Sequence, residues 1–150
     1  MCWQIVSLIS SIATTVAAVF IAWQVHVARK TMQAQTFLRI IDTARSIRFS
    51  QGMDIIRSLR YDNYEQFRRS ETKEVQGQVR DIVDFVNDLN HLLREKYVTE
   101  EQVRQIYSSS IRSCAERLLP WWLWGFRDQH GGPYYYKNFE ELCKRFEASG

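Results

Sequence analysis

The feature that most constrains this sequence is an N-terminal run without charged residues. None of the 20 Lys and Arg or the 17 Asp and Glu residues occurs before Arg29. The run from Trp3 to Val27 is rich in Ile, Val, Leu and Ala. About 20 apolar residues in a helix are enough to cross a ~30 Å hydrocarbon core. The sequence therefore predicts a transmembrane helix over residues 1–28.

The residues that flank this run predict its placement in a membrane. Trp3 and Trp23 would lie at opposite interfaces, where indole rings prefer to be. Arg29 and Lys30 follow the run directly, and an excess of basic residues is retained in the cytoplasm. We therefore expect the N-terminus outside and the C-terminal domain in the cytoplasm. The alternatives are a buried core helix or a cleaved signal peptide, and a signal peptide would need a basic start and a small-residue cleavage site.

Small residues recur every three or four positions along one face of the predicted span. They are Ser7, Ser11, Thr14, Thr15, Ala18 and Ala22. Small side chains let transmembrane helices approach closely, and hydroxyls can bond across the contact. One interpretation is therefore a homo-oligomer that forms through this face. The other is that the hydroxyls bond only to carbonyls of their own helix.

Beyond the span, the apolar residues keep helical spacing, and no stretch alternates convincingly as a strand would. Neither Gly nor Pro interrupts the chain before Gly52. We therefore expect the span to continue as a stalk helix whose first break is Gly52. Residues 29–73 are predicted to form this basic juxtamembrane stalk and a connecting segment.

Residues 74–150 are predicted to form a helical bundle. From Glu74 to Lys96 apolar residues recur at alternating spacings of four and three, with the wide apolar face of a bundle helix. Thr99 and Gln102 resemble a capping box, which starts a second helix. The short connection between these two helices predicts an antiparallel hairpin.

A second capping-box pattern, Asn138 with Glu141, precedes a last amphipathic helix. The predicted fold class is therefore all-α. It comprises a single N-terminal transmembrane helix that continues into a stalk, followed by a cytoplasmic antiparallel helical bundle.

Several segments of the C-terminal half resemble an uncharacterised family of small bacterial membrane proteins. They are Ile82–Leu89, the acidic turn Thr99–Glu101, the Trp-rich segment with Arg127, and Phe139–Leu142. The resemblance implies one N-terminal span in the bacterial inner membrane and a helical cytoplasmic domain of unknown function. It brings no assigned activity, although several members look like companions of phage-defence or mobile-element genes.

The sequence contains no pattern that indicates an enzyme. It lacks a phosphate-binding Gly-rich loop, and its three His are scattered without metal-ligand spacing. We therefore expect no catalytic residues, no metal and no cofactor. If the chain were an enzyme, the best candidates would be Asp84, Asp88 and His91 on one helix. The more ordinary interpretation of these carboxylates is the solvated face of that helix.

Charge is uneven along the soluble part. Residues 29–73 hold ten Lys and Arg and five Asp and Glu, whereas residues 74–150 hold ten and twelve. A basic juxtamembrane half suits the anionic lipids of the inner leaflet. A nucleotide-type anionic ligand is a second option, and nucleic acid is the least favoured. The candidate contacts for lipid or ligand are Arg57, Arg60, Arg68 and Arg69.

The densest aromatic cluster follows Pro120 and comprises Trp121, Trp122, Trp124 and Phe126. Its members point to several sides of a helix, so they must be buried or covered by another chain. The cluster is interpreted as core, as a surface for a partner or a second copy, or as a membrane contact. All three interpretations stay open at this point.

These features predict a membrane-anchored, self-associating helical protein whose cytoplasmic domain binds a protein partner or signal. One extension is an effector of bacterial defence that perturbs the membrane, because an oligomer can gather Ser and Thr around its axis. The alternative is a passive anchor or accessory subunit that recruits another protein to the inner membrane.

Overall fold

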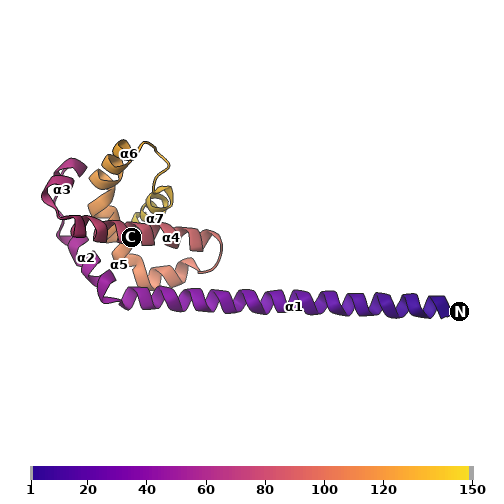
Figure 1. The fold of residues 1–150 in the computed structure, drawn as a ribbon. Helices are drawn as coiled ribbons and strands as arrows, with labels where there is room; N and C mark the ends of the chain where they lie inside the picture. The colour runs from indigo at the N-terminus through magenta and orange to yellow at the C-terminus, as the bar shows by residue number, and fades with distance from the viewer. Residues whose placement is uncertain (1, 149–150) are drawn as a thin grey trace.

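The computed structural model describes the backbone of residues 2–148 and the side chains of residues 13–148. Its elements are α1 (Cys2–Arg45), α2 (Ile47–Ser58), α3 (Tyr64–Ser70), α4 (Lys73–Arg94), α5 (Glu100–Leu118), the π-helical turn η1 (Leu119–Leu123), α6 (Trp124–His130) and α7 (Lys137–Glu147). None of these described residues lies in a strand, so the all-α prediction is confirmed. The helix α1 projects far beyond a bundle that contains the other elements (Figure 1).

The first break in the chain is at Ser46, so the prediction of a break at Gly52 is wrong. Ser46 has extended backbone angles, and its hydroxyl accepts a hydrogen bond from the N–H of Phe49 at 3.2 Å, which caps α2. Gly52 lies inside α2 instead. A Cβ there would lie 2.8 Å from Cγ1 of Ile82, so this glycine permits a close approach of α2 to α4.

Four helices, α2, α4, α7 and α5, surround the core. The helix α2 packs against α4 and α5, and α7 packs against the same two helices. The helices α4 and α5 follow each other through a short connection, as predicted, but they contact each other over only a short length. They therefore lie diagonally opposite, with α2 and α7 between them.

The core of the bundle includes residues from the segment that precedes α4. Ile40 of α1 and Phe49, Met53 and Ile56 of α2 are buried in the same cluster as the apolar face of α4. The hydroxyl of Tyr107 in α5 also donates a hydrogen bond to the carbonyl of Ile40. The packed unit therefore begins near Ile40 rather than at residue 74, and the end of α1 belongs to it.

The segment η1 and α6 carries an aromatic layer that packs against α3. The ring of Trp122 lies edge-on to that of Tyr64, at 6.1 Å between centroids, and Trp121 lies 5.4 Å from Phe67. A Cβ on Gly125 would lie 2.2 Å from Cβ of Tyr64. Gly125 is therefore required for α6 to lie this close to α3.

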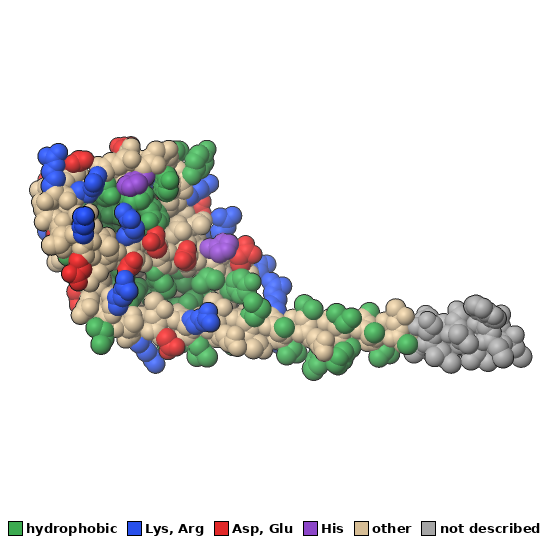
Figure 2. All heavy atoms as spheres, viewed as in Figure 1, with side chains coloured by type: hydrophobic (Ala, Val, Ile, Leu, Met, Phe, Trp, Pro, Cys, Tyr) green, Lys and Arg blue, Asp and Glu red, His purple; other side chains and the backbone are tan. Residues whose placement is uncertain are grey.

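The part of α1 that leaves the bundle exposes hydrophobic side chains from Val16 to Val27 (Figure 2). Within the residues that the structure describes, no helix is both long and apolar enough to cross a membrane. The span was predicted over residues 1–28, and the side chains before Ala13 lie outside the described residues.

Candidate functional site

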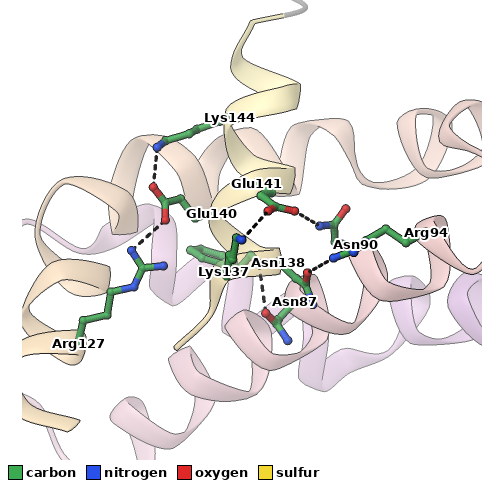
Figure 3. Close-up of polar contacts among 10 residues, drawn as sticks. Asn87, Asn90, Arg94, Arg127, Lys137, Asn138, Glu140, Glu141 and Lys144 are labelled. Carbon is green, nitrogen blue, oxygen red and sulfur yellow. Dashed lines mark hydrogen bonds and ion pairs between the residues drawn. The ribbon is translucent and has the colours of Figure 1, made fainter. Parts of the chain in front are cut away.

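Polar residues of α4 and α6 hold α7 in place (Figure 3). The side-chain oxygen of Asn87 accepts a hydrogen bond from the N–H of Phe139 at 3.2 Å. One turn further along α4, the amide of Asn90 donates to Glu141 at 3.4 Å, and Arg94 donates to Asn138 at 3.3 Å. Asn87 thereby satisfies an N–H of the first turn of α7, as a capping side chain does.

The predicted cap of this helix differs from the observed one. The helix α7 begins at Lys137, and the residue before it, Tyr136, is left-handed with φ 55° and provides no side-chain cap. Asn138 and Glu141 instead bond to Arg94 and Asn90 of α4. The sequence pattern pointed to the correct region, but the capping side chain comes from a different helix.

Arg127 of α6 contacts α7 through a separate ion pair and is only 7% exposed (Figure 3). Its Nη1 lies 2.8 Å from Oε2 of Glu140, and its Nε donates to the carbonyl of Tyr135 at 2.9 Å. Lys144 donates to the other oxygen of Glu140. The hydrogen bond from Lys144 and the guanidinium of Arg127 lower the pKa of Glu140, against the opposing effect of burial. A charged pair this deep is stable only because both groups are partnered.

Two buried polar atoms in this region lack a hydrogen-bond partner. They are Nη2 of Arg127 and Oδ1 of Asn90. Asn90 is fully buried, so each unpartnered atom costs free energy of folding. The contacts of α7 are therefore incompletely satisfied, and they mark the bundle's most polar interior region among the described residues.

A set of exposed rings, which we call the aromatic corner, lies on α6 and on the turn that follows it. It comprises Trp124, His130, Tyr134 and Tyr135. Tyr134 is 82% exposed and Trp124 is 56% exposed, whereas the guanidinium of Arg127 lies 5.5 Å from the centre of the Trp124 ring. His130 stacks on Phe126 with 4.0 Å between ring centroids. Exposed Trp and Tyr side chains on a rigid support are typical of protein-binding surfaces.

The four predicted aromatic surface residues do not stay together. Trp121, Trp122 and Phe126 are buried in the bundle, and Trp124 alone is exposed. Burial of three members agrees with the interpretation of the cluster as core. Tyr134 and Tyr135 were not singled out by the sequence analysis. The only signal for them was their place after the turn that contains Gly131 and Gly132.

The residues that could carry chemistry do not converge on a catalytic arrangement. Cys114 and Cys143 are buried thiols, and burial raises the pKa of Cys114 to about 12. Asp84, Asp88 and His91 are exposed on α4. Burial raises the pKa of Tyr136, and the nearby carboxyl of Asp84 raises it further. Among the described residues no group of three or more His, Cys, Asp or Glu side chains could hold a metal ion.

The predicted anion contacts lie on α2, α3 and the loop between them, and each contacts a group of this chain. Arg57 pairs with Asp54 at 3.3 Å, and Arg69 pairs with Glu65 at 3.3 Å. Arg60 donates to backbone carbonyls, and Arg68 donates to Gln129 of α6. Figure 1 places α3 at the end of the bundle away from the projecting part of α1. The four side chains are therefore spread over α2, α3 and the loop between them, and each already contacts a group of this chain.

The predicted membrane residues fall into two groups. Thr14, Thr15, Ala18 and Ala22 are exposed on α1, as are Trp23, Arg29 and Lys30. The side chains of Trp3, Ser7 and Ser11 lie outside the described residues. The exposed members leave both an oligomer contact and a membrane contact possible for this face.

Comparison with known proteins identifies a family but no function. Residues 9–146 match a family described as a domain of unknown function, DUF4760. No curated protein and no solved structure matches the sequence. Because the match covers nearly the whole chain, the chain belongs to this uncharacterised family.

Proposed function

We propose that this member of the DUF4760 family is a membrane-anchored, self-associating helical protein whose bundle binds a protein partner. The observation that carries the proposal is the exposed apolar surface of α1. The large apolar side chains that are exposed on this segment are Val16, Val19, Phe20, Ile21, Trp23, Val25 and Val27. At about 100° per residue, five of them lie within an arc of about 100°, and Ile21 and Val25 lie on the opposite side of the helix. A helix that exposes large apolar side chains on opposite sides is favoured in an apolar environment.

The charge pattern supports an orientation for this anchor. Arg29 and Lys30 are exposed at the point where the uncharged run ends. They favour a single span in the bacterial inner membrane, with the N-terminus outside and the bundle in the cytoplasm. The last turns of α1 pack on the bundle, and Gln33 donates a hydrogen bond to the carbonyl of Lys96 at 2.8 Å. This contact would hold the bundle close to the membrane surface.

The aromatic corner is the surface we propose for the partner. Trp124, Tyr134 and Tyr135 are exposed, and the polar contacts of α7 and Arg127 hold the segment that carries them. Aromatic anchors held in place by a rigid scaffold lose little conformational entropy on binding.

Membrane anchoring is tested by fractionation of cells that express the full chain. We expect the protein in the membrane fraction after washing at alkaline pH and release only by detergent. A reporter that is active only in the periplasm, fused after residue 150, should give no signal. Neutral replacements of Arg29 and Lys30 should weaken this orientation. Release by alkaline washing alone would contradict the anchor.

Partner binding is tested with a photo-crosslinking residue in place of Tyr134, with a matched variant at exposed Asp62 as control. We expect one discrete crosslinked product at position 134 that is absent at position 62. The mass of the particle extracted in detergent tests self-association, and a strict monomer at micromolar concentration would contradict it.

A further inference from the structure

An apolar hollow lies where α1, α2 and α4 meet. Phe49, Ile82 and Phe85 line it, and Thr43 of α1 forms one edge. Its volume is about 110 Å³, several times the ~10–15 Å³ that one water molecule needs. In an adjoining surface groove, the side chain of Ile47 is 77% exposed. Figure 2 shows hydrophobic side chains gathered between α1 and α4 on this face.

Gly77 of α4 lies in the surface groove that adjoins the hollow and that Ile47 also lines. A glycine inside a helix costs about 0.5–1 kcal/mol relative to alanine. At Gly52 and Gly125 a Cβ would collide with Ile82 and Tyr64, but at Gly77 no atom lies within 4 Å. The packing of the bundle therefore does not require this glycine. Its effect is to keep the groove open beside Ile47.

The charges around the groove carry both signs. Arg48 and Asp81 form an exposed ion pair across it, and Lys73 and Glu74 line the same groove. The patch thus contains a protruding apolar side chain, a hollow that can receive one, and charges of both signs. Such a surface is complementary to a copy of itself turned by a two-fold rotation, which sets each residue against the same patch of the partner.

The direction of α1 agrees with this pairing. At about 100° per residue, Thr14, Ala18, Met32 and Thr36 lie within about 20° of Thr43 around the helix axis. The face of small residues and the edge of the hollow therefore lie on the same side of α1. Two copies anchored in one membrane have parallel α1 helices, so the same two-fold axis can pass beside both features.

We propose that this patch is the docking surface for a second copy of this chain. Ile47 of each copy enters the hollow of the other. Arg48, which pairs with Asp81 of its own chain in the single copy, then lies against Asp81 of the partner subunit. The inference rests on the proposed self-association and assigns the cytoplasmic surface that carries it.

The test uses two single variants of the full chain in detergent, each with its own affinity tag. In a homodimer, Arg48→Asp places an aspartate opposite Asp81 of the partner subunit. Asp81→Arg likewise places an arginine opposite Arg48 of the partner subunit, so each variant sets like charges against each other. Each variant alone should therefore raise the dimer dissociation constant at least about tenfold. A mixture of the two variants restores both contacts, so the tags should co-purify as heterodimers. Single variants that dimerise like the wild type, or a mixture that stays monomeric, would overturn the proposal.

A second set of variants separates this surface from the span. Gly77→Leu fills the open groove with a good helix former, and Ile47→Asp removes the protruding side chain; both should weaken the dimer. Leu38→Asp changes another exposed apolar residue, which lies on α1 outside the patch, and should not weaken the dimer. If leucine at Thr14 and Ala18 breaks the dimer while the groove variants leave it intact, the groove pairing fails and the proposed anchor stands. A monomeric wild type in the membrane fraction overturns self-association but not anchoring.

Discussion

Trp23 and Trp122 are the same residue type in opposite environments. Trp23 on the projecting part of α1 is 60% exposed, whereas Trp122 in η1 is 2% exposed. Trp122 packs against Tyr64, Phe126 and Tyr136. Among the described side chains, the one ring contact of Trp23 is with Phe20 of its own helix. The hydrophobicity of one residue therefore does not determine whether this chain buries it.

The arrangement of apolar residues around each helix explains the difference. The apolar residues of α4 occupy one side, and that side is buried in the bundle. Those of α1 between Val16 and Val27 lie on opposite sides of the helix, and a bundle can cover only one side of a helix. The bundle accordingly covers α1 only near Ile40, where the apolar residues return to a single face.

The largest expected effect is the difference in unfolding free energy between alanine substitutions at Trp122 and at Trp23. Trp122→Ala removes a buried ring from the aromatic layer and should lower the free energy of unfolding by about 3–5 kcal/mol. Trp23→Ala removes no contact with the bundle and should leave that free energy unchanged. Urea unfolding of the detergent-extracted chain, followed by far-ultraviolet circular dichroism, measures both. Equal losses would show that the projecting helix is packed on the bundle.

A second comparison concerns two arginines in ion pairs. Arg127→Ala leaves Glu140 buried with only Lys144 and should cost about 3 kcal/mol. Arg48→Ala breaks an exposed pair with Asp81 and should cost less than about 1 kcal/mol. The same unfolding measurement at low protein concentration, where copies are separate, checks the difference. A larger loss at Arg48 would contradict the assignment of Arg127 as the central support of α7.

Local patterns predicted the elements whose signals lie within a few residues. The alternating apolar spacing predicted α4 within two residues at either end. The pair Thr99 and Gln102 predicted the start of α5, and both hydrogen bonds of the capping box are present. These signals are reliable because propensity, capping and amphipathicity of one helix all act locally.

Features that depend on distant residues could not be predicted in this way. The cap of α7 comes from Asn87, 52 positions before Phe139. Gly52 was expected to break a helix, yet its role is to admit Ile82 of another helix. The pairing of Arg127 with Glu140 likewise required the packing of α6 beside α7. No spacing rule within a single helix indicates any of these contacts.

Acid should reduce the stability that the contacts of α7 contribute more than it reduces the contribution of an exposed ion pair. The pKa of Glu140 is lowered in the folded chain, so the unfolded chain binds its proton more readily. The stability that Glu140 contributes is present above its ordinary pKa, near 4.5, and is lost as pH falls through the lower folded value. Unfolding free energy should therefore decline less steeply below about pH 4.5 in Glu140→Gln than in the wild type. Glu65→Gln at an exposed pair is the control, and identical pH profiles for all three proteins would contradict the role of Glu140.

The smallest effect is expected from alanine substitution at two glycines of the bundle, Gly77 and Gly52. The change in the free energy of unfolding should have opposite signs at the two positions. Gly77→Ala adds a methyl group where no atom lies within 4 Å and removes backbone freedom from the unfolded chain. It should stabilise the bundle by about 0.5–1 kcal/mol. Gly52→Ala would bring its Cβ to 2.8 Å from Cγ1 of Ile82, so Ile82 must move and the bundle should lose stability. Thermal unfolding of both variants measures whether each substitution raises or lowers the stability of the bundle. If Gly77→Ala destabilised the separate chain, Gly77 would have a packing role in the bundle itself, and its presence would no longer suggest that the groove is kept open for a second copy.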